Sequence, residues 1–186
     1  NASFPYAGDW QDELQRTGIR QNYSLSVSNG DKSSDYFFSV GYTKDQGIVK
    51  NSNYDRFTTR LNVNSNITKW LKTGISLSGT LDEQRFFLSS NSAYTNPFFT
   101  TRMMAPIYPV YRFDANGNRM YEADGVTPIY DFGVNDVNNP SGLVQERPFA
   151  TNTNVIASLF QDDRQTRALN GFGKAYMEAK FLKDFT

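Results

Sequence analysis

Residues 55–81 read Asp55-Arg-Phe-Thr-Thr-Arg-Leu-Asn-Val-Asn-Ser-Asn-Ile-Thr-Lys-Trp-Leu-Lys-Thr-Gly-Ile-Ser-Leu-Ser-Gly-Thr-Leu81. Two segments of this stretch alternate between polar side chains and apolar or small ones, and a short turn joins them. Because successive side chains of a strand point to opposite faces, the pattern predicts an antiparallel hairpin with one apolar and one polar face. Each arm is about 10 residues long, the length that a tilted strand needs to cross a bilayer.

A soluble β-sandwich also contains alternating hairpins, but its apolar faces form a core of large residues. Here the apolar face mixes Leu, Val and Ile with Gly and Thr. The opposite face carries Arg60, Asn62, Asn64 and Lys72, which are too polar for a dry interior. The hairpin alone is compatible with either fold, so the rest of the chain must discriminate between them.

The composition favours β structure with wet faces. The chain has 186 residues and a net charge of zero, and aromatic residues make up 15% of it although only 38% is hydrophobic. Aromatic rings with few aliphatic residues are typical of strands with aromatic girdles. The balanced charge gives no reason to expect nucleic acid as a partner.

The chain contains neither Cys nor His. It therefore lacks the commonest general base, the commonest metal ligand and any thiol nucleophile. We expect no enzyme activity, no catalytic residue, no cofactor and no metal site. The chain has no run of 18 apolar residues, which would predict a transmembrane helix.

Three further strands are predicted at residues 20–28, 35–43 and 167–181. The connections alternate between short ones (29–34 and 65–70) and longer ones (44–53 and 82–167), as in bacterial barrels with short periplasmic turns and long external loops. Five strands cannot close a barrel, for which about eight is the minimum. Both ends of the sequence also interrupt recognisable patterns, so we expect an internal piece of a longer polypeptide.

The long segment 82–167 is rich in aromatic rings and has no strand of membrane length. Two turn signals, at 114–118 and 122–126, predict a small hairpin on it. The rings could stack on a sugar, contact a partner protein or pack on the segment itself. The candidate contact residues are Phe86, Phe87, Tyr94, Phe98, Phe99, Arg102, Tyr108 and Tyr111.

Three motifs favour structural over chemical roles. Asp114-Ala-Asn-Gly-Asn118 resembles the start of a calcium loop, which requires Gly at position six and Glu at position twelve. Here Gly117 is at position four and Gly125 at position twelve, which favours a plain turn. The acid pairs Asp12-Glu13 and Asp162-Asp163 are adjacent in sequence, so they do not form the separated carboxyl pair of a glycosidase. Asp9, which precedes the first of these pairs, is a candidate N-cap for a short helix.

An ordered set of motifs then resembles one family, the SusC/RagA-like TonB-dependent outer-membrane transporters of Bacteroidetes. The motifs are Asp9-Trp-Gln-Asp-Glu13, Gln21-Asn-Tyr-Ser-Leu-Ser-Val-Ser28, Gly41-Tyr-Thr-Lys-Asp-Gln-Gly-Ile-Val-Lys-Asn-Ser52, Arg60-Leu-Asn-Val-Asn-Ser-Asn-Ile-Thr-Lys-Trp-Leu-Lys72, Asn96-Pro-Phe-Phe99, Ala105-Pro-Ile-Tyr-Pro-Val-Tyr111 and Lys180-Phe-Leu-Lys-Asp-Phe185. No single motif is specific, but their order is, and the resemblance runs over nearly the whole chain.

The resemblance implies an all-β fold, an antiparallel transmembrane barrel of about 22 strands with an N-terminal plug. The present chain would supply about five of these strands and lack the plug. The implied organisation is a plug-to-barrel connection at 1–19, four barrel strands at 20–84, a long extracellular loop at 85–166 and a fifth strand at 167–186. Turns 29–34 and 65–70 would be periplasmic.

The resemblance also implies a function, which is import of oligosaccharides or peptides across the bacterial outer membrane. The implied partners are a SusD-like surface lipoprotein, outer-membrane lipid and TonB, the last through parts that this chain lacks. Arg60, Asn62, Lys174 and Glu178 would face the lumen. The alternative is a soluble β-sandwich module that binds carbohydrate through the aromatic segment.

Overall fold

The computed structural model describes residues 8–86, 96–114, 116–134, 147–162 and 164–181. The chain divides into two compact units. We call residues 18–47, 52–85 and 165–186 the strand unit, and residues 1–17, 48–51 and 86–164 the loop unit.

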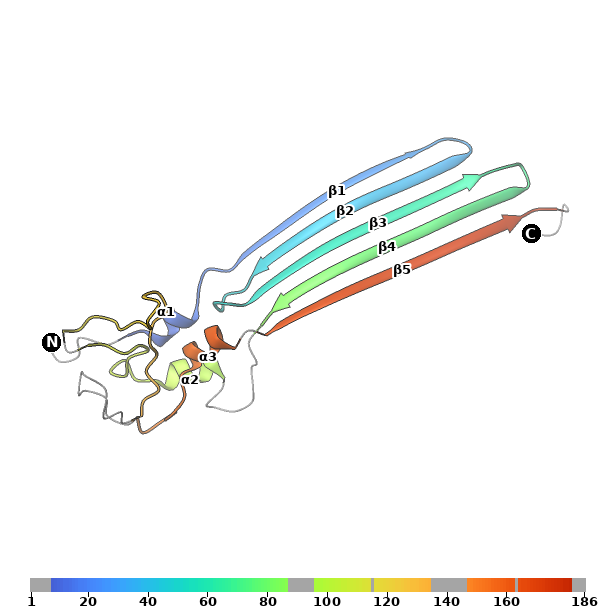
Figure 1. Ribbon diagram of the computed structural model, residues 1–186. Helices are drawn as coiled ribbons and strands as arrows, with labels where there is room; N and C mark the ends of the chain where they lie inside the picture. The colour runs from blue at the N-terminus through green and yellow to red at the C-terminus, as the bar shows by residue number, and fades with distance from the viewer. Residues whose placement is uncertain (1–7, 87–95, 115, 135–146, 163, 182–186) are drawn as a thin grey trace. The chain divides into compact units, whose positions relative to one another are not determined.

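The strand unit is one five-stranded antiparallel sheet in which the strands lie in sequence order (Figure 1). Its edge strands β1 and β5 each pair with one neighbour. All five strands predicted from the alternation are present, and most extend beyond the predicted ends. The strands are β1 (Ile19–Gly30), β2 (Ser34–Gln46), β3 (Asn53–Asn66), β4 (Leu71–Arg85) and β5 (Gln165–Ala179).

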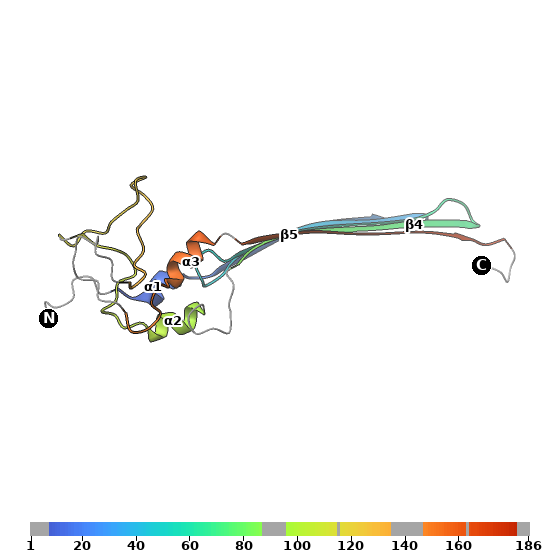
Figure 2. The same cartoon turned by 60° about the horizontal axis from the view of Figure 1, so that its bottom comes forward.

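The register keeps residues of one kind on one face through all five strands. Leu61, for example, lies between Phe38 and Leu77, whereas Arg60 lies between Ser39 and Ser78. Figure 2 shows the sheet nearly edge-on as a single layer. The described residues form no second sheet with which it could make a sandwich, so the structure supports the barrel-type fold.

Short turns close one end of the sheet. Between β1 and β2, the Asp31 carboxylate accepts hydrogen bonds from the backbone amides of Ser33 and Ser34 and from the Ser33 hydroxyl. These bonds favour the ionised form and lower the pKa of Asp31 to about 2. At the other end of the sheet, β2 and β3 are joined by residues 47–52, where the Gly47 amide donates to the Ser52 carbonyl.

The loop unit contains three short helices, each with a side chain that caps its N-terminus. They are α1 (Trp10–Leu14), α2 (Pro97–Met103) and α3 (Val155–Gln161). Asp9 caps α1 as predicted, and Asn96 and Asn154 cap the other two by accepting bonds from the first free amides. Helices α2 and α3 were not predicted from the sequence, although Asn96-Pro97 places a capping residue before a proline at the first helical position.

The loop unit has a hydrophobic core of its own. Trp10 and Leu14 from α1 are almost fully buried there together with Ile156 of α3. A three-segment meander lies where the small hairpin was predicted, with bridges between Phe113 and Arg119 and between Tyr121 and Pro128. The long segment therefore packs around a core, and side chains of α1, which precedes β1 in the sequence, form part of that core. Whether residues 1–19 connect to a plug stays a prediction.

Within the parts of the chain that the structure describes, no helix is both long enough and apolar enough to cross a membrane.

Candidate functional site

The polar face of the strand unit holds the four residues predicted to face a lumen. By register Arg60 lies opposite Ser78, Asn62 and Lys174 both flank Ser76, and Glu178 lies opposite Lys72. The structure thus brings the four onto one face. That this face lines a lumen stays a prediction.

A hydrogen-bond chain ties three strands together on the polar face. The Tyr176 hydroxyl lies 3.0 Å from Asn64 Oδ1, and Asn64 Nδ2 donates to Asp35 at 2.8 Å. The Tyr176 ring lies over Gly74, where an added Cβ would overlap the ring. Gly74 therefore allows the ring to lie flat on the sheet and reach Asn64 across an intervening strand.

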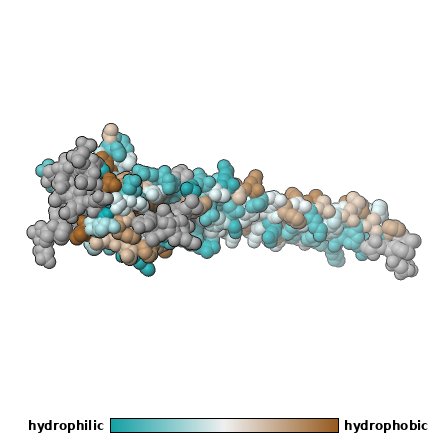
Figure 3. Space-filling model, turned by 90° about the horizontal axis from the view of Figure 1, so that it is seen from below, coloured by the Kyte–Doolittle hydropathy of each residue, from teal (hydrophilic) through white to brown (hydrophobic). Residues whose placement is uncertain are grey.

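The apolar face is open to its surroundings. Leu25 is 63% exposed, Leu77 47% and Leu169 80%, although a soluble sheet would bury such residues. On β4 the apolar positions run from Leu71 to Leu81, roughly 33 Å along the strand, which a tilt of about 40° reduces to about 25 Å. Toward the turns of the sheet, brown and teal atoms gather on different sides in Figure 3.

The apolar face changes character between two rows of residues that lie side by side across the five strands. The aromatic row ends the apolar region and consists of Tyr23, Tyr42, Phe57, Leu81 and Leu169. The next row away from the short turns, here called the charged row, consists of Gln21, Lys44, Asp55, Glu83 and Arg167. An aromatic row followed by charges is the arrangement found where a strand leaves the hydrocarbon.

The predicted contact residues of the long segment divide into buried and exposed groups. Tyr111 is buried, and Phe98 and Tyr108 pack partly buried against the core, so these three support the loop unit itself. Phe99 and Arg102 on α2 are exposed. Phe86 is half-buried. Phe87 and Tyr94 lie outside the described residues.

Exposed apolar side chains and one arginine lie on α2 and just after it in the sequence. Phe99 is 43% exposed, and its ring lies 6.4 Å from that of Phe149. Met103 and Ile107 are also exposed, at 56% and 45%. We call Phe99, Arg102, Met103 and Ile107 the α2 surface. Large exposed apolar side chains around an arginine are typical of protein contact sites.

Glu13 connects α1 to three other segments of the loop unit. It accepts a hydrogen bond from the Tyr111 hydroxyl at 2.8 Å and forms ion pairs with Lys50 and Arg119. The Arg119 guanidinium also stacks 3.8 Å from the Tyr111 ring centroid. Burial, and then the bond to Glu13, raises the pKa of Tyr111. These contacts give Glu13 a structural role in the loop unit, in place of the catalytic role considered for an acid pair.

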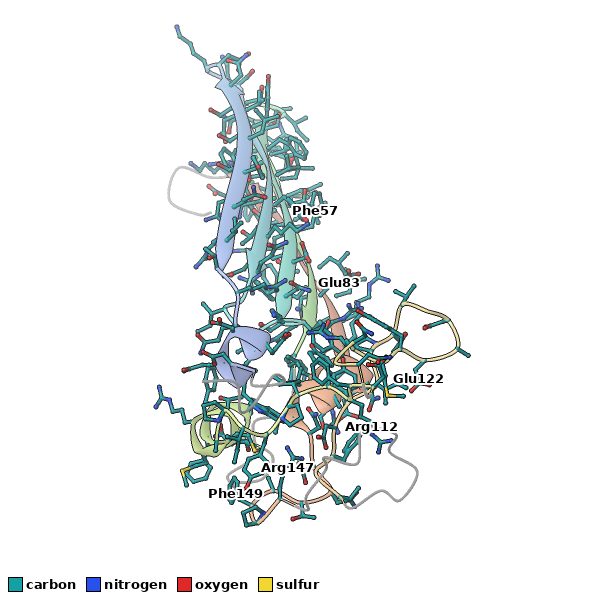
Figure 4. The ribbon with its side chains drawn as sticks, turned by 90° about the vertical axis from the view of Figure 1, so that its left-hand side faces the viewer. Phe57, Glu83, Arg112, Glu122, Arg147 and Phe149 are labelled. Atoms are coloured by element: carbon teal, nitrogen blue, oxygen red, sulfur yellow. The ribbon has the colours of Figure 1, made fainter. Side chains whose placement is uncertain are left out.

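Arg147 is the most buried cation in the described part of the loop unit, with 2% of its surface exposed (Figure 4). Its guanidinium donates to the carbonyls of Thr153 and Ala150 and lies 5.4 Å from the Trp10 ring centroid. Burial lowers the pKa of Arg147 and raises that of the neighbouring Asp131. Sequence patterns do not reveal such a residue, because a buried arginine and a surface arginine look alike in sequence.

No group of three acidic residues that could hold a metal ion occurs among the described residues. The Asp114 carboxylate accepts hydrogen bonds from the backbone amides of Asn116 and Asn118, as expected for a plain turn. Hydrogen bonds from the Asn118 amide and side chain, and then from the Asn116 amide, lower the pKa of Asp114.

Comparison with known proteins identifies the family. No protein-family model matches the chain. The chain is 37% identical over 142 residues to the TonB-dependent receptor P3 of Formosa agariphila, a match that covers 76% of this chain. It is 46% identical over 55 residues to the TonB-dependent receptor SusC of Bacteroides thetaiotaomicron, which covers 30% of this chain. The chain belongs to the SusC/RagA-like TonB-dependent receptors.

The chain spans a small part of the length of these receptors, 14% of receptor P3 and 6% of SusC. The fold agrees with this family. The solved structure of the RagAB peptide transporter matches 95% of the chain with a TM-score of 0.55 at 21% identity, and the match covers 18% of that transporter chain. The family likeness expected from the ordered motifs is thus confirmed, as is the barrel-type sheet.

Proposed function

We propose that the strand unit is a stretch of barrel wall in an outer-membrane importer, with its apolar face on lipid and its polar face toward the interior. The observation that carries the proposal is the exposed apolar face, which continues in register through all five strands. Such a face is unfavourable in water but suits a bilayer.

The direction of the strands follows from the connections. Ile19, Gln46, Asn53, Arg85 and Gln165 lie in one row, so every segment of the loop unit joins the sheet at the same end. Long connections of such barrels are external and short ones periplasmic. We therefore place the loop unit, including residues 8–17, outside the cell.

The proposed cargo is an oligosaccharide or a peptide, and the proposed partner is a SusD-like surface lipoprotein. The similarity to SusC and to a peptide transporter supports this choice. The α2 surface is the best contact site for the partner, because its apolar side chains are exposed on a unit with a folded core. Energy from TonB would act through parts of the receptor that this chain does not contain.

Fractionation of the source cells tests the membrane assignment. An antibody to residues 116–130 would report the compartment and the apparent mass of the native chain. We expect an outer-membrane band that changes mobility on boiling, as intact barrels do. A band in the soluble fraction would contradict the proposal and favour the carbohydrate-binding module, for which the described residues offer no second sheet.

Purification of the receptor with its partner tests the α2 surface. We expect the double variant Phe99→Ser/Met103→Ser to lose most of the co-purified lipoprotein while outer-membrane assembly stays normal. Val126→Ser is the matched control, because Val126 is 77% exposed on the meander. Equal retention in both variants would remove the α2 surface from the interface.

A further inference from the structure

We propose that Lys44 and Arg167 are two separate contact points for phosphate-bearing lipid headgroups at the outer edge of the apolar face, three strands apart in one row. The inference rests on the proposed membrane function and adds a partner to it. Both residues belong to the charged row, which follows the aromatic row on the same face. Two residues along a strand span about 7 Å, so the charged row lies at headgroup depth when the aromatic row lies at the hydrocarbon boundary.

The carboxylates of the charged row are engaged within the sheet. Asp55 accepts a hydrogen bond from the Tyr42 hydroxyl at 2.6 Å, and Glu83 lies 3.0 Å from Arg167 Nε. Figure 4 shows Glu83 and Phe57, a member of the aromatic row, on the sheet. These bonds leave the acids satisfied without help from a lipid.

Arg167 retains capacity for a second partner. A guanidinium has five N–H donors, and the contact with Glu83 uses the Nε group. The side chain of Arg167 is 66% exposed on the edge strand β5. Its remaining donors can therefore form the forked contact with phosphate that arginine favours. Lys44 on β2 lies three strands away in the charged row, roughly 14 Å by the spacing of strands, so it would hold the phosphate of a neighbouring lipid.

The opposite end of the apolar face shows that charge is not a general property of strand ends here. Its last rows contain no charged side chain on the strands. They consist of Asn29, Tyr36, Val63, Ile75 and Ala175, then Ser34, Ser65, Thr73 and Met177, then Leu71 and Ala179. On the apolar face, the charged side chains of the strands are thus confined to the end that we place outside. A leaflet rich in phosphate there would explain the asymmetry.

The charged row as a whole is neutral, because two cations face two acids. Free phosphate would gain little from such a row at ordinary salt concentrations. A lipid gains in addition from its acyl chains, which would lie on the exposed apolar rows beside the aromatic row. The site is therefore expected to hold a phosphate that is anchored by lipid and to ignore inorganic phosphate.

Native mass spectrometry of the detergent-extracted receptor tests the site. Phosphatidic acid is titrated into the micelles, with diacylglycerol and inorganic phosphate as comparison probes. We expect phosphatidic acid to bind, and Lys44→Gln/Arg167→Gln to weaken it about fivefold for each cation removed. The matched control is Arg60→Gln/Lys174→Gln, which removes the same charge from the opposite face.

Equal weakening in both double variants, or none in Lys44→Gln/Arg167→Gln, would overturn the proposal. So would binding of diacylglycerol as tight as that of phosphatidic acid. Lys44→Gln alone keeps the test decisive if loss of Arg167 disturbs Glu83. Failure of the unchanged receptor to appear in the outer membrane would instead contradict the proposed function, which separates the two outcomes.

Discussion

The indole Nε1 of Trp10 donates a hydrogen bond to the main-chain carbonyl of Tyr108 at 2.8 Å, across 98 positions of sequence. Trp10 is only 2% exposed, and the Arg147 guanidinium lies against its ring. The segment before β1 therefore completes the core of the loop unit, and does not merely lead into the sheet.

Trp10→Ala should consequently destabilise the loop unit by about 3–5 kcal/mol, because it leaves a cavity and removes the Tyr108 contact. We expect faster proteolysis of the loop unit in intact cells, while barrel assembly stays normal. Val126→Ala is the control, because Val126 is largely exposed. Unchanged protease resistance of Trp10→Ala would show that α1 is dispensable.

Asp131 should make the stability of the loop unit depend on pH. Burial raises its pKa in the folded chain above the ordinary value of 3.8, so the folded state takes up a proton first as the pH falls. Relative to Asp131→Asn, the native chain should therefore gain stability as the pH drops from neutral through the raised pKa. Asparagine keeps an oxygen that can accept the Gly133 amide, as Asp131 does.

Hydrogen exchange at the Ile156 and Ala157 amides, which bond to Asn154 beside Asp131, measures this difference. Comparing the two chains at each pH cancels the intrinsic pH dependence of exchange. A native chain that lost protection relative to Asp131→Asn as the pH falls would contradict the assigned direction of the Asp131 pKa shift.

Much of the sheet could be predicted from the sequence, because a period of two fixes which face each residue takes once a register is set. The predicted ends were too short where the apolar alternation stops. β2 continues through Lys44 and Asp45 to Gln46, since backbone pairing with β3 persists into the charged row. Hydropathy does not report those bonds.

The loop unit was largely beyond prediction, because its core depends on contacts between distant segments. Nothing in the local sequence indicates that Trp10 meets Tyr108 or that Arg147 is buried. The helix caps Asn96 and Asn154 were readable signals, whereas the aromatic residues were not separable into core and surface. Tyr111 and Phe99 look equivalent in sequence, but the first is buried and the second exposed.

Gly74→Val should disturb the polar face, because a side chain at this position would occupy the place of the Tyr176 ring. We expect loss of the Tyr176–Asn64 hydrogen bond and weaker pairing of β4 with β5, seen as a lower temperature for the mobility change on boiling. Gly171→Val is the control, since an added Cβ there meets nothing within 4 Å. Equal temperatures for the two variants would argue that the ring moves aside without consequence.

Leu77→Arg tests which face of the sheet meets lipid. Leu77 lies in the middle of β4 on the apolar face, between Leu61 and Gly173. An arginine there would place a charge at the middle of the hydrocarbon, which costs about 2–4 kcal/mol near the midplane. Assembly into the outer membrane should therefore fall.

Ser76→Arg adds the same charge one residue earlier on the polar face, beside Asn62 and Lys174, and should assemble at close to the normal level. If Ser76→Arg failed and Leu77→Arg assembled, the two faces would have to be exchanged. Normal assembly of both would mean that the sheet does not cross a bilayer.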